Sequence, residues 1–383
     1  MPDHHGPFAM IRLSELKLPL TELPVEVRRA ADAPAETDAD RQLPPHPVEA
    51  LRQLAAKALG IAPTEIDALH VFKRSFDARK QNLLVVYIVD VQLKDASQET
   101  ALLAQHKNHS HIQATPDMAW HAPAQAPGDW GAHAGERPVV VGFGPCGMFA
   151  ALVLAQMGFK PIVIERGPTV RQRTKDTWGL WRKKILNTES NVQFGEGGAG
   201  TFSDGKLYSQ IKDPRHLGRK VMHEFVRFGA PEEILFTAHP HIGTFKLVKV
   251  VEGLREEIIR LGGEVRFEQR VVDVVYDDAR ALQGLRVLKL DTGDTYTLPT
   301  QQVVMALGHS SRDTFTMLHR HSVAMEAKPF SVGVRIEHPQ SVIDRARWGQ
   351  HAGHPLLGAA DYKLVHHAQN GRAVYSFCMC PGG

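Results

Sequence analysis

Three glycines with a spacing typical of nucleotide binding occur in the segment RPVVVGFGPCGMFAALVLAQMGFKPIVIERG, residues 137–167. Gly142, Gly144 and Gly147 fit the pattern G-x-G-x-x-G. The first glycine permits a tight turn, the second lets the backbone approach a pyrophosphate, and the third lets a helix pack on a strand. Glu165 follows at about the expected interval of 20 residues, where its carboxylate can accept hydrogen bonds from both ribose hydroxyls of an adenosine.

A second glycine-rich stretch, NVQFGEGGAGTFSDGKL, spans residues 191–207. Gly195, Gly197, Gly198 and Gly200 make this loop dense in small residues, so backbone amides can press against a flavin or its diphosphate. A flexible surface loop is the alternative. The fingerprint of residues 142–147 serves both NAD and FAD, and no second G-x-G-x-x-G is present. A dedicated NAD(P) domain is therefore not predicted, although NAD(P)H remains a candidate transient electron donor.

The elements that must position these residues are indicated by hydrophobic patterns. Val139, Val140 and Val141 form a buried-strand run, a helix begins at about Cys146, and residues 159–164 form a second strand ending at Glu165. Further along, helices are predicted at 214–228 and 244–261, the latter with Thr244 as N-cap, and strands at 264–267, 271–276, 284–290, 295–298 and 302–306. Alternating helices and strands interrupted by a run of strands indicate an α/β domain carrying a β insertion.

The N-terminal part has a different pattern. Residues 1–9 are predicted to be a disordered extension, and residues 10–103 a small α+β domain with a helix at 47–59, ended by Gly60, and strands at 68–76 and 83–93. Residues 104–136, rich in Pro and Gly, are predicted to be an interdomain linker. No cysteine or close carboxylate completes a ligand set with the linker histidines, so no metal site is predicted.

Composition excludes several classes of protein. The chain has 383 residues, of which 43% are hydrophobic and 23% charged, with a net charge of +3 and three cysteines. These values exclude wholesale disorder and a disulfide scaffold, and they favour a reducing, cytoplasmic compartment. They also make nucleic acid an unlikely general partner. The uncharged segment 139–159 is divided by glycines and Pro145, so no membrane partner is predicted, and the oligomeric state is left open.

Longer stretches resemble a known family. FGEGGAGTFSDGK, KPFSVGVRIEHPQ, ADYKLVHH and YSFCMCPGG, with LKLPL and VFKRSFDARK near the start, resemble a bacterial family of FAD-dependent dehydrogenases or oxidoreductases. This family is part of the glutathione-reductase-like FAD superfamily, and the resemblance covers residues 10–383. It implies a Rossmann-like FAD-binding domain with a β-rich substrate-domain insertion, following the small N-terminal α+β domain.

The resemblance also implies roles for particular residues. Gly142, Gly144, Pro145, Cys146 and Gly147 are expected to carry the FAD diphosphate, and Glu165, followed by Arg166, to bind the adenosine ribose. The remaining expected FAD contacts are Arg173, Gly195, Gly197, Gly198, Ala199, Gly200 and Thr201 along the diphosphate and flavin, Val271 at the adenine, and Ala306 and Gly308 closing the site.

One departure from the superfamily pattern concerns the C-terminus. Relatives return to the FAD domain through a Gly-Asp turn that leads into a helix, whereas the Gly-Asp pairs here lie at 128–129 and 293–294, in the linker and in a hairpin. The chain is therefore expected to be truncated. Residues 137–310 are predicted to form the FAD-binding domain, with the insertion near 271–300, and residues 311–383 a partial substrate or cap domain that lacks the FAD-closing segment.

No catalytic acid or base is identified from the sequence. Lys363 is a candidate for binding an anionic substrate, and Cys378 and Cys380 could take electrons from a flavin as a dithiol, or be unpaired thiols. The main hypothesis is an FAD-dependent oxidoreductase that passes a hydride or electrons to an unassigned small molecule or electron carrier. Two alternatives are a non-enzymatic fragment with an incomplete FAD site and an RNA-associated flavoprotein that binds RNA through Lys73, Arg74, Arg79 and Lys80 beside Phe72 and Phe76.

Overall fold

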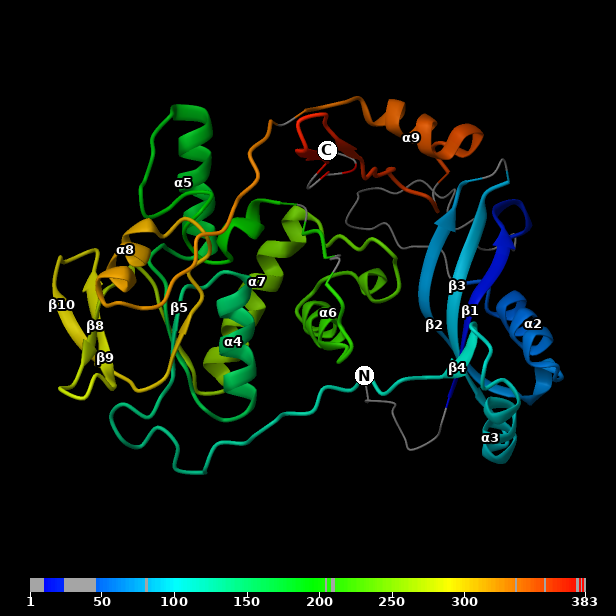
Figure 1. Cartoon of the computed structure of the whole chain (residues 1–383), viewed down its shortest axis with the longest axis horizontal. Helices are drawn as coiled ribbons and strands as arrows, with labels where there is room; N and C mark the ends of the chain where they lie inside the picture. The colour runs from blue at the N-terminus through cyan, green and yellow to red at the C-terminus, as the bar shows by residue number, and fades with distance from the viewer. Residues whose placement is uncertain are drawn as a thin grey trace.

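The computed structural model describes residues 10–23, 46–79, 82–203, 205–207, 211–334, 336–354, 356–376, 379 and 381. Cys378 and Cys380 lie outside these ranges, as do the predicted extension 1–9 and Lys80. The fold is mixed α/β. Figure 1 shows one lobe built on an N-terminal sheet and a second lobe built on the strand β5 and the helices α4 and α7.

The N-terminal lobe is an antiparallel sheet with helices packed against it. Its strand order is β2-β3-β1-β4, with β1 at Ile11–Pro19, β2 at Ile66–Asp77, β3 at Leu84–Leu93 and β4 at Ile112–Ala114. The helix α2, Val48–Leu59, ends at Gly60 in the left-handed region, as its sequence predicts. It buries Leu51, Ala55 and Leu59 in the core of this lobe.

Three elements of this lobe were not predicted from the sequence: β1, α3 and β4. The helix α3, Ala96–Gln105, begins after Asp95, whose side chain accepts a hydrogen bond from the Ser97 backbone N–H at 2.9 Å. The strand β4 lies inside the predicted linker 104–136 but pairs with β1, so this part of the linker prediction is wrong. A strand of three residues with a single buried side chain, Ile112, carries no periodic signal.

The second lobe contains a parallel sheet with the order β11-β5-β6-β7. Its strands are β5 at Val139–Val141, β6 at Ile162–Ile164, β7 at Glu264–Arg266 and β11 at Val303–Met305. Side chains of β5 and β6 are buried on both faces, which is characteristic of a parallel sheet covered on two sides.

Different layers cover the two faces of the parallel sheet. Val140 and Val163 pack in the core with the helices α4, Pro145–Gln156, and α7, Thr244–Arg260. Residues on the other face pack against an antiparallel sheet formed by β8 at Gln269–Tyr276, β9 at Leu282–Lys289 and β10 at Thr295–Pro299. This sheet occupies the predicted β insertion. Thr244 is the first residue of α7, and the N-cap is Gly243, one residue before the predicted cap.

The remaining helices and strands connect and extend the two lobes. They are α5 Val170–Lys183, α6 Leu217–Arg227, α8 Arg312–Arg320, α9 Gln340–Trp348, β12 Val365–His367, β13 Ala373–Tyr375 and the short 3-10 helices η1 Leu20–Glu22, η2 Pro63–Glu65, η3 Gly198–Phe202, η4 Glu232–Leu235 and η5 Gly349–His351. In the described part of the chain, no helix combines the length and apolar character that crossing a bilayer requires.

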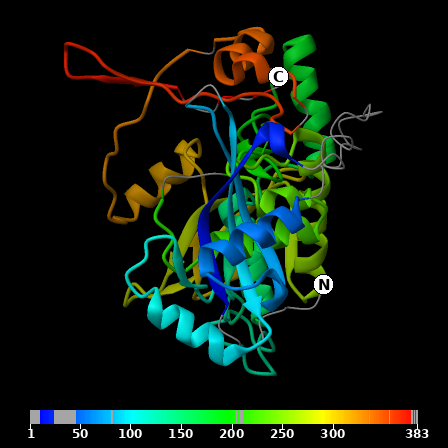
Figure 2. The same cartoon turned by 90° about the vertical axis from the view of Figure 1, so that its right-hand side faces the viewer.

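Part of the predicted substrate or cap region packs on the N-terminal lobe. Trp348, Leu356 and Leu357 belong to the same core as β1 and β3, and the Trp348 ring lies edge-on to Phe76 with centroids 6.0 Å apart. Beyond this contact, the hairpin of β12 and β13 extends away from the body of the molecule (Figure 2). The C-terminal part of the chain is therefore packed on the N-terminal lobe through Trp348, Leu356 and Leu357.

One of the basic residues considered for RNA binding, Arg74 on β2, is buried. Arg74 is only 4% exposed, and its backbone N–H donates to the Phe236 carbonyl at 2.7 Å. Burial lowers the pKa of Arg74. Lys73 is exposed, and Arg79 pairs with Asp77 at 2.6 Å. Arg74 is therefore part of the contact between the lobes rather than of a nucleic-acid surface.

Candidate functional site

The predicted glycine turn connects β5 to α4. Gly142 has φ 98°, and a Cβ built on it would lie 2.4 Å from the Ala306 carbonyl oxygen. A Cβ on Gly147 would lie 1.9 Å from the Gly142 carbonyl oxygen. Both contacts are far closer than a carbon can approach oxygen. The fold itself therefore requires glycine at the first and third positions of the motif.

The second glycine has no such packing requirement. Gly144 has φ −79°, which other residues adopt, and a Cβ added to it would meet no described atom closer than the Gly198 Cα at 3.6 Å. Gly144 is also the N-cap of α4. Among the described residues no side chain caps this helix, and its first turn contains no acidic residue. The first N–H groups of α4 thus form a positive helix end on which an anion can bind.

Glu165 follows β6 and is buried at 5% exposure. Within the described residues, its carboxylate accepts hydrogen bonds from the backbone N–H groups of Phe143 at 2.7 Å, Gly167 at 2.8 Å and Gly195 at 3.1 Å. Burial raises the pKa of Glu165, although these hydrogen bonds act in the opposite sense. Glu165 therefore ties the glycine turn to the loop that contains Gly195.

These bonds change the expected role of Glu165 at a ribose. A carboxylate has about four acceptor positions, and the three backbone donors already occupy most of them in the described structure. The carboxylate has room for about one ribose hydroxyl. Accepting both hydroxyls, as the sequence suggested, requires the Gly195 N–H to be released.

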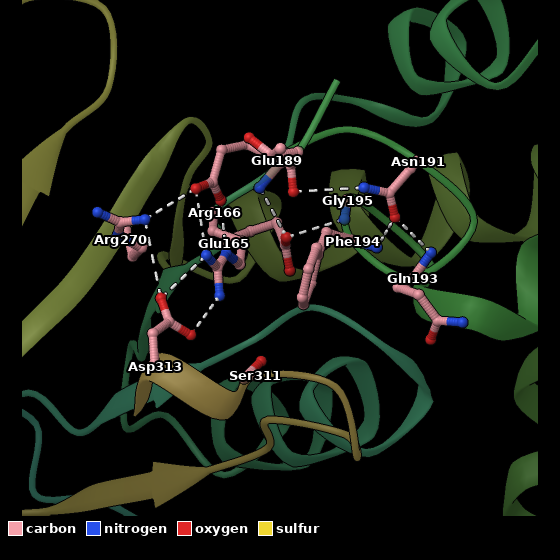
Figure 3. Close-up of polar contacts among 12 residues, drawn as sticks. Glu165, Arg166, Glu189, Asn191, Gln193, Phe194, Gly195, Arg270, Ser311 and Asp313 are labelled. Carbon is pink, nitrogen blue, oxygen red and sulfur yellow. Dashed lines mark hydrogen bonds and ion pairs between the residues drawn. The ribbon is translucent and has the colours of Figure 1, made fainter. Parts of the chain in front are cut away.

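Arg166 is the centre of a charged network beside Glu165 (Figure 3). It forms paired hydrogen bonds with Glu189, at 2.6 and 3.2 Å, and with Asp313, at 3.0 and 3.1 Å. Arg270 donates to Glu189 at 2.8 Å, and the Arg166 guanidinium lies over the Phe194 ring. Burial opposes the charge of Arg166, but the carboxylates outweigh it and raise its pKa. The network joins β6, the glycine-rich loop, β8 and α8.

Arg173, on α5, is fully buried and holds the glycine-rich loop from inside. Its guanidinium donates to the carbonyls of Asn191 at 2.9 Å, Val192 at 2.9 Å and Glu196 at 2.7 Å, and to the Thr201 hydroxyl at 3.3 Å. Burial lowers the pKa of Arg173 to about 10, while Glu165 and Glu196 favour its charge. In this structure Arg173 supports the loop backbone rather than facing open space.

The structure brings most of the predicted residues together. Gly198 lies against Gly144, and Ala306 lies over the turn, where its N–H donates to the Val141 carbonyl at 2.8 Å. The other predicted residues near the turn and loop fall into two groups: Pro145, Cys146, Ala199 and Gly308 are at least partly exposed, whereas Gly195, Gly197 and Thr201 are buried and Gly200 is half-buried.

Two further predicted residues lie outside the turn and the loop. The Val271 side chain is buried between the insertion sheet and the parallel sheet, which leaves the backbone of β8 for the expected adenine contact, and β8 starts beside the site, with the Gln269 N–H donating to the Glu165 carbonyl at 3.1 Å. Lys363 is exposed, two residues before β12. Within the described ranges, no three His, Cys, Asp or Glu side chains gather as a metal site.

Sequence reasoning missed Glu189, Asp313 and Arg270. Glu189 lies 23 positions after Arg166 and Asp313 lies 147 positions after it, and Arg270 comes from the insertion sheet. Charge patterns identify helix neighbours but not partners so far apart in sequence. The available signal was Arg166 itself, because an arginine directly after a buried strand needs acidic partners nearby.

Comparisons with known proteins give two partial matches to family models. Residues 329–383 match a family described as FAD-dependent protein, C-terminal domain-like, and residues 10–92 match a domain of unknown function. An uncharacterized protein of Clostridium beijerinckii is 44% identical over 336 residues, which are 87% of this chain. The chain spans 60% of the length of that curated relative.

Among solved structures, similarity is low in sequence and in shape. Thermovibrio ammonificans THI4 gives a TM-score of 0.35 at 17% identity over 49% of this chain and 63% of that protein. The 3-ketosteroid-delta4-(5alpha)-dehydrogenase of Rhodococcus jostii RHA1 gives 0.31 at 15% identity, covering 48% of each chain. The E. coli quinol fumarate reductase subunit FrdA gives 0.33 at 15% identity, covering 48% of this chain and 37% of that one.

Proposed function

We propose that this chain is the nucleotide-binding part of an FAD-dependent oxidoreductase, with a Rossmann-like FAD-binding domain built on β5, α4 and β6. The observation that carries the proposal is the uncapped N-terminus of α4 at Gly144, where the fold does not require glycine. A residue without a side chain at that point is what close approach of a pyrophosphate needs. The match of residues 329–383 to an FAD-dependent protein supports the same cofactor.

In this proposal each residue near the turn has a defined task. The N–H groups at the start of α4 hold the diphosphate, and Glu165 accepts one ribose hydroxyl at its remaining acceptor position. Arg173 fixes the loop 191–201 through that loop's carbonyls, so that Gly198 and Gly200 line the cofactor. The network of Arg166 with Glu189 and Asp313 sets the position of the loop and of α8 at the adenosine end.

The redox chemistry comes from the cofactor, because a bound flavin can take a hydride or electrons from a donor such as NAD(P)H and pass them to a small molecule or carrier. The chain's own residues bind and orient the cofactor and exclude water from its adenosine end. Two of its buried carboxylates, Glu165 and Glu196, have pKa values raised by burial. Glu165 accepts from backbone N–H groups, and Glu196 accepts from the Val170 N–H and from the Arg255 guanidinium.

The proposal is tested by the flavin content of the protein. The 383-residue chain and a version extended to the length of the Clostridium relative are purified. A sample of each is denatured, and the chromophore that it releases is identified by chromatography. We expect FAD in the extended protein and binding of added FAD by the chain, with loss of flavin absorbance when NADPH is added anaerobically to the extended protein. A colourless extended protein that does not take up added FAD contradicts the proposal.

A further inference from the structure

The end of α5 exposes an unusual set of large apolar side chains. We define the α5 tip as residues 178–186. Within it Trp178 is 44% exposed, Trp181 55%, Ile185 62% and Leu186 58%. Single exposed apolar residues are ordinary on protein surfaces, but a contiguous group of this size marks an interaction site. The charged network of Arg166 does not use these side chains, although Trp181 contacts Phe202 of the glycine-rich loop.

The first turns of α5 are anchored by buried side chains, whereas its last turn is exposed. Arg173 and Thr177 are buried on the inner face of α5. The Trp178 and Trp181 ring centroids are 6.2 Å apart. Trp181 follows Thr177 by four residues, so it continues the same face of α5, and it lies edge-on to Phe202 at 5.9 Å. Figures 1 and 2 both show the far end of α5 standing clear of the rest of its lobe. The tip is therefore presented outward by a helix whose base is fixed in the core.

The tip is also strongly basic. Arg182, Lys183 and Lys184 are exposed, and the Arg182 guanidinium lies over the Trp178 ring at 4.1 Å. Asp176 is the acidic residue nearest in sequence, and it accepts hydrogen bonds from Gln172 and Ser190. The apolar side chains are thus surrounded by positive charge that no carboxylate of the tip offsets.

We propose that the α5 tip docks on the surface of an anionic lipid bilayer. Tryptophan rings favour the boundary between headgroups and acyl chains, aliphatic side chains gain from burial below it, and lysine and arginine attract anionic headgroups. The tip places all three kinds of side chain within nine residues. Surface docking of this kind needs no spanning helix, so it agrees with the helix lengths of the described chain.

Two other occupants fit the tip less well. A nucleic acid strand uses the cations and stacks on the tryptophans, but it leaves the aliphatic Ile185 and Leu186 without a partner. A second copy of the chain docking tip to tip brings two clusters of like charge together, which opposes association. A bilayer satisfies both the charge and the aliphatic surface.

The experiment is sedimentation of the full chain with lipid vesicles. One set contains phosphatidylserine and phosphatidylcholine in equal parts, and the other contains phosphatidylcholine alone. We expect binding to the anionic vesicles, a blue shift of tryptophan emission on binding, and weakening as salt is raised. Failure to bind the anionic vesicles at low salt overturns the proposal. This readout requires no flavin, so its outcome is separate from that of the proposed function.

Paired variants test which residues are responsible. Lys183→Gln with Lys184→Asn removes two charges, Asn being chosen because Lys184 has φ 57°. The partition coefficient is expected to fall about 25-fold, or roughly fivefold for each charge. The matched control is Lys57→Gln with Lys107→Asn, two exposed lysines on other elements, and it should bind as the unmodified chain does.

The apolar contribution is tested in the same way. Ile185→Ser with Leu186→Ser should weaken vesicle binding and abolish the blue shift, whereas Val332→Ser with Val334→Ser, an aliphatic pair that is 84% and 95% exposed, should change neither. Equal loss in the control pair overturns the proposal, because binding is then non-specific. Tip-dependent binding of a single-stranded RNA without vesicle binding, or tip-dependent dimerisation seen by light scattering without vesicle binding, also overturns it.

Discussion

Replacing Gly144 with alanine should abolish tight FAD binding while leaving the fold intact. The backbone at Gly144 has an ordinary φ of −79°, and the added Cβ meets no described atom closer than 3.6 Å. The same Cβ stands at the N-terminus of α4, where the diphosphate approaches the backbone in our proposal. Loss of even one hydrogen bond to a charged phosphate, about 1.5–3 kcal/mol, weakens binding roughly 10- to 100-fold.

The measurement pairs a thermal melt with FAD titration. Gly144→Ala should melt close to the temperature of the unmodified chain, because alanine reduces the freedom of the unfolded chain but is a poorer N-cap than glycine, and the two effects oppose each other. Gly147→Ala is the contrasting variant, because its Cβ would lie 1.9 Å from the Gly142 carbonyl oxygen, and it should lower the melting temperature itself. Unchanged FAD affinity in a folded Gly144→Ala protein contradicts the placement of the diphosphate.

Replacing Arg173 with methionine should have the largest effect on stability. The methionine fills similar space but leaves the carbonyls of Asn191, Val192 and Glu196 without their donor, and it removes the positive charge near Glu165 and Glu196. Removing one member of such a buried arrangement costs about 3–5 kcal/mol. Urea denaturation followed by tryptophan fluorescence should show a midpoint lower by about 1–3 M.

Arg171→Met is the matched control for this prediction. Arg171 lies on the same helix and pairs with Glu252, but its side chain is 75% exposed, so its loss should leave the urea midpoint close to that of the unmodified chain. Limited proteolysis adds a local readout, since Arg173→Met should expose the loop 191–201 to cleavage. Equal urea midpoints for the two variants would show that Arg173 does not hold the loop.

The glycine turn was predictable because its determinants are local. A strand, a turn that only glycine permits and a helix lie within about 20 residues, and their geometry follows from steric limits. The insertion sheet was equally visible, since β8 contains four valines, β9 is rich in leucine and valine, and β10 alternates threonine with larger side chains. By contrast, the two large apolar residues of α3, Leu102 and Leu103, are adjacent in sequence, and β4 has only three residues, so neither element produced a periodic signal.

The tertiary contacts of the site residues were not predictable. The sequence placed Glu165 and Arg173 at a ligand, but it carries no indication that the Gly195 N–H would occupy Glu165 or that loop carbonyls would occupy Arg173. Buried polar groups find partners wherever the fold supplies them, and these partners lie up to 30 positions away. The pairing of Arg166 with Asp313 depends on the packing of α8, which no local pattern fixes.

The central claim is that the turn at Gly144 and the carboxylate of Glu165 hold the adenosine diphosphate half of FAD. Calorimetric titration of the chain with ADP, and separately with FMN, tests it most directly, because ADP contains that half and FMN lacks it. We expect ADP to bind to the unmodified chain, the Gly144→Ala variant to lose that binding, and FMN not to bind to either. Binding of FMN without ADP, or ADP binding that Gly144→Ala leaves unchanged, would contradict the account.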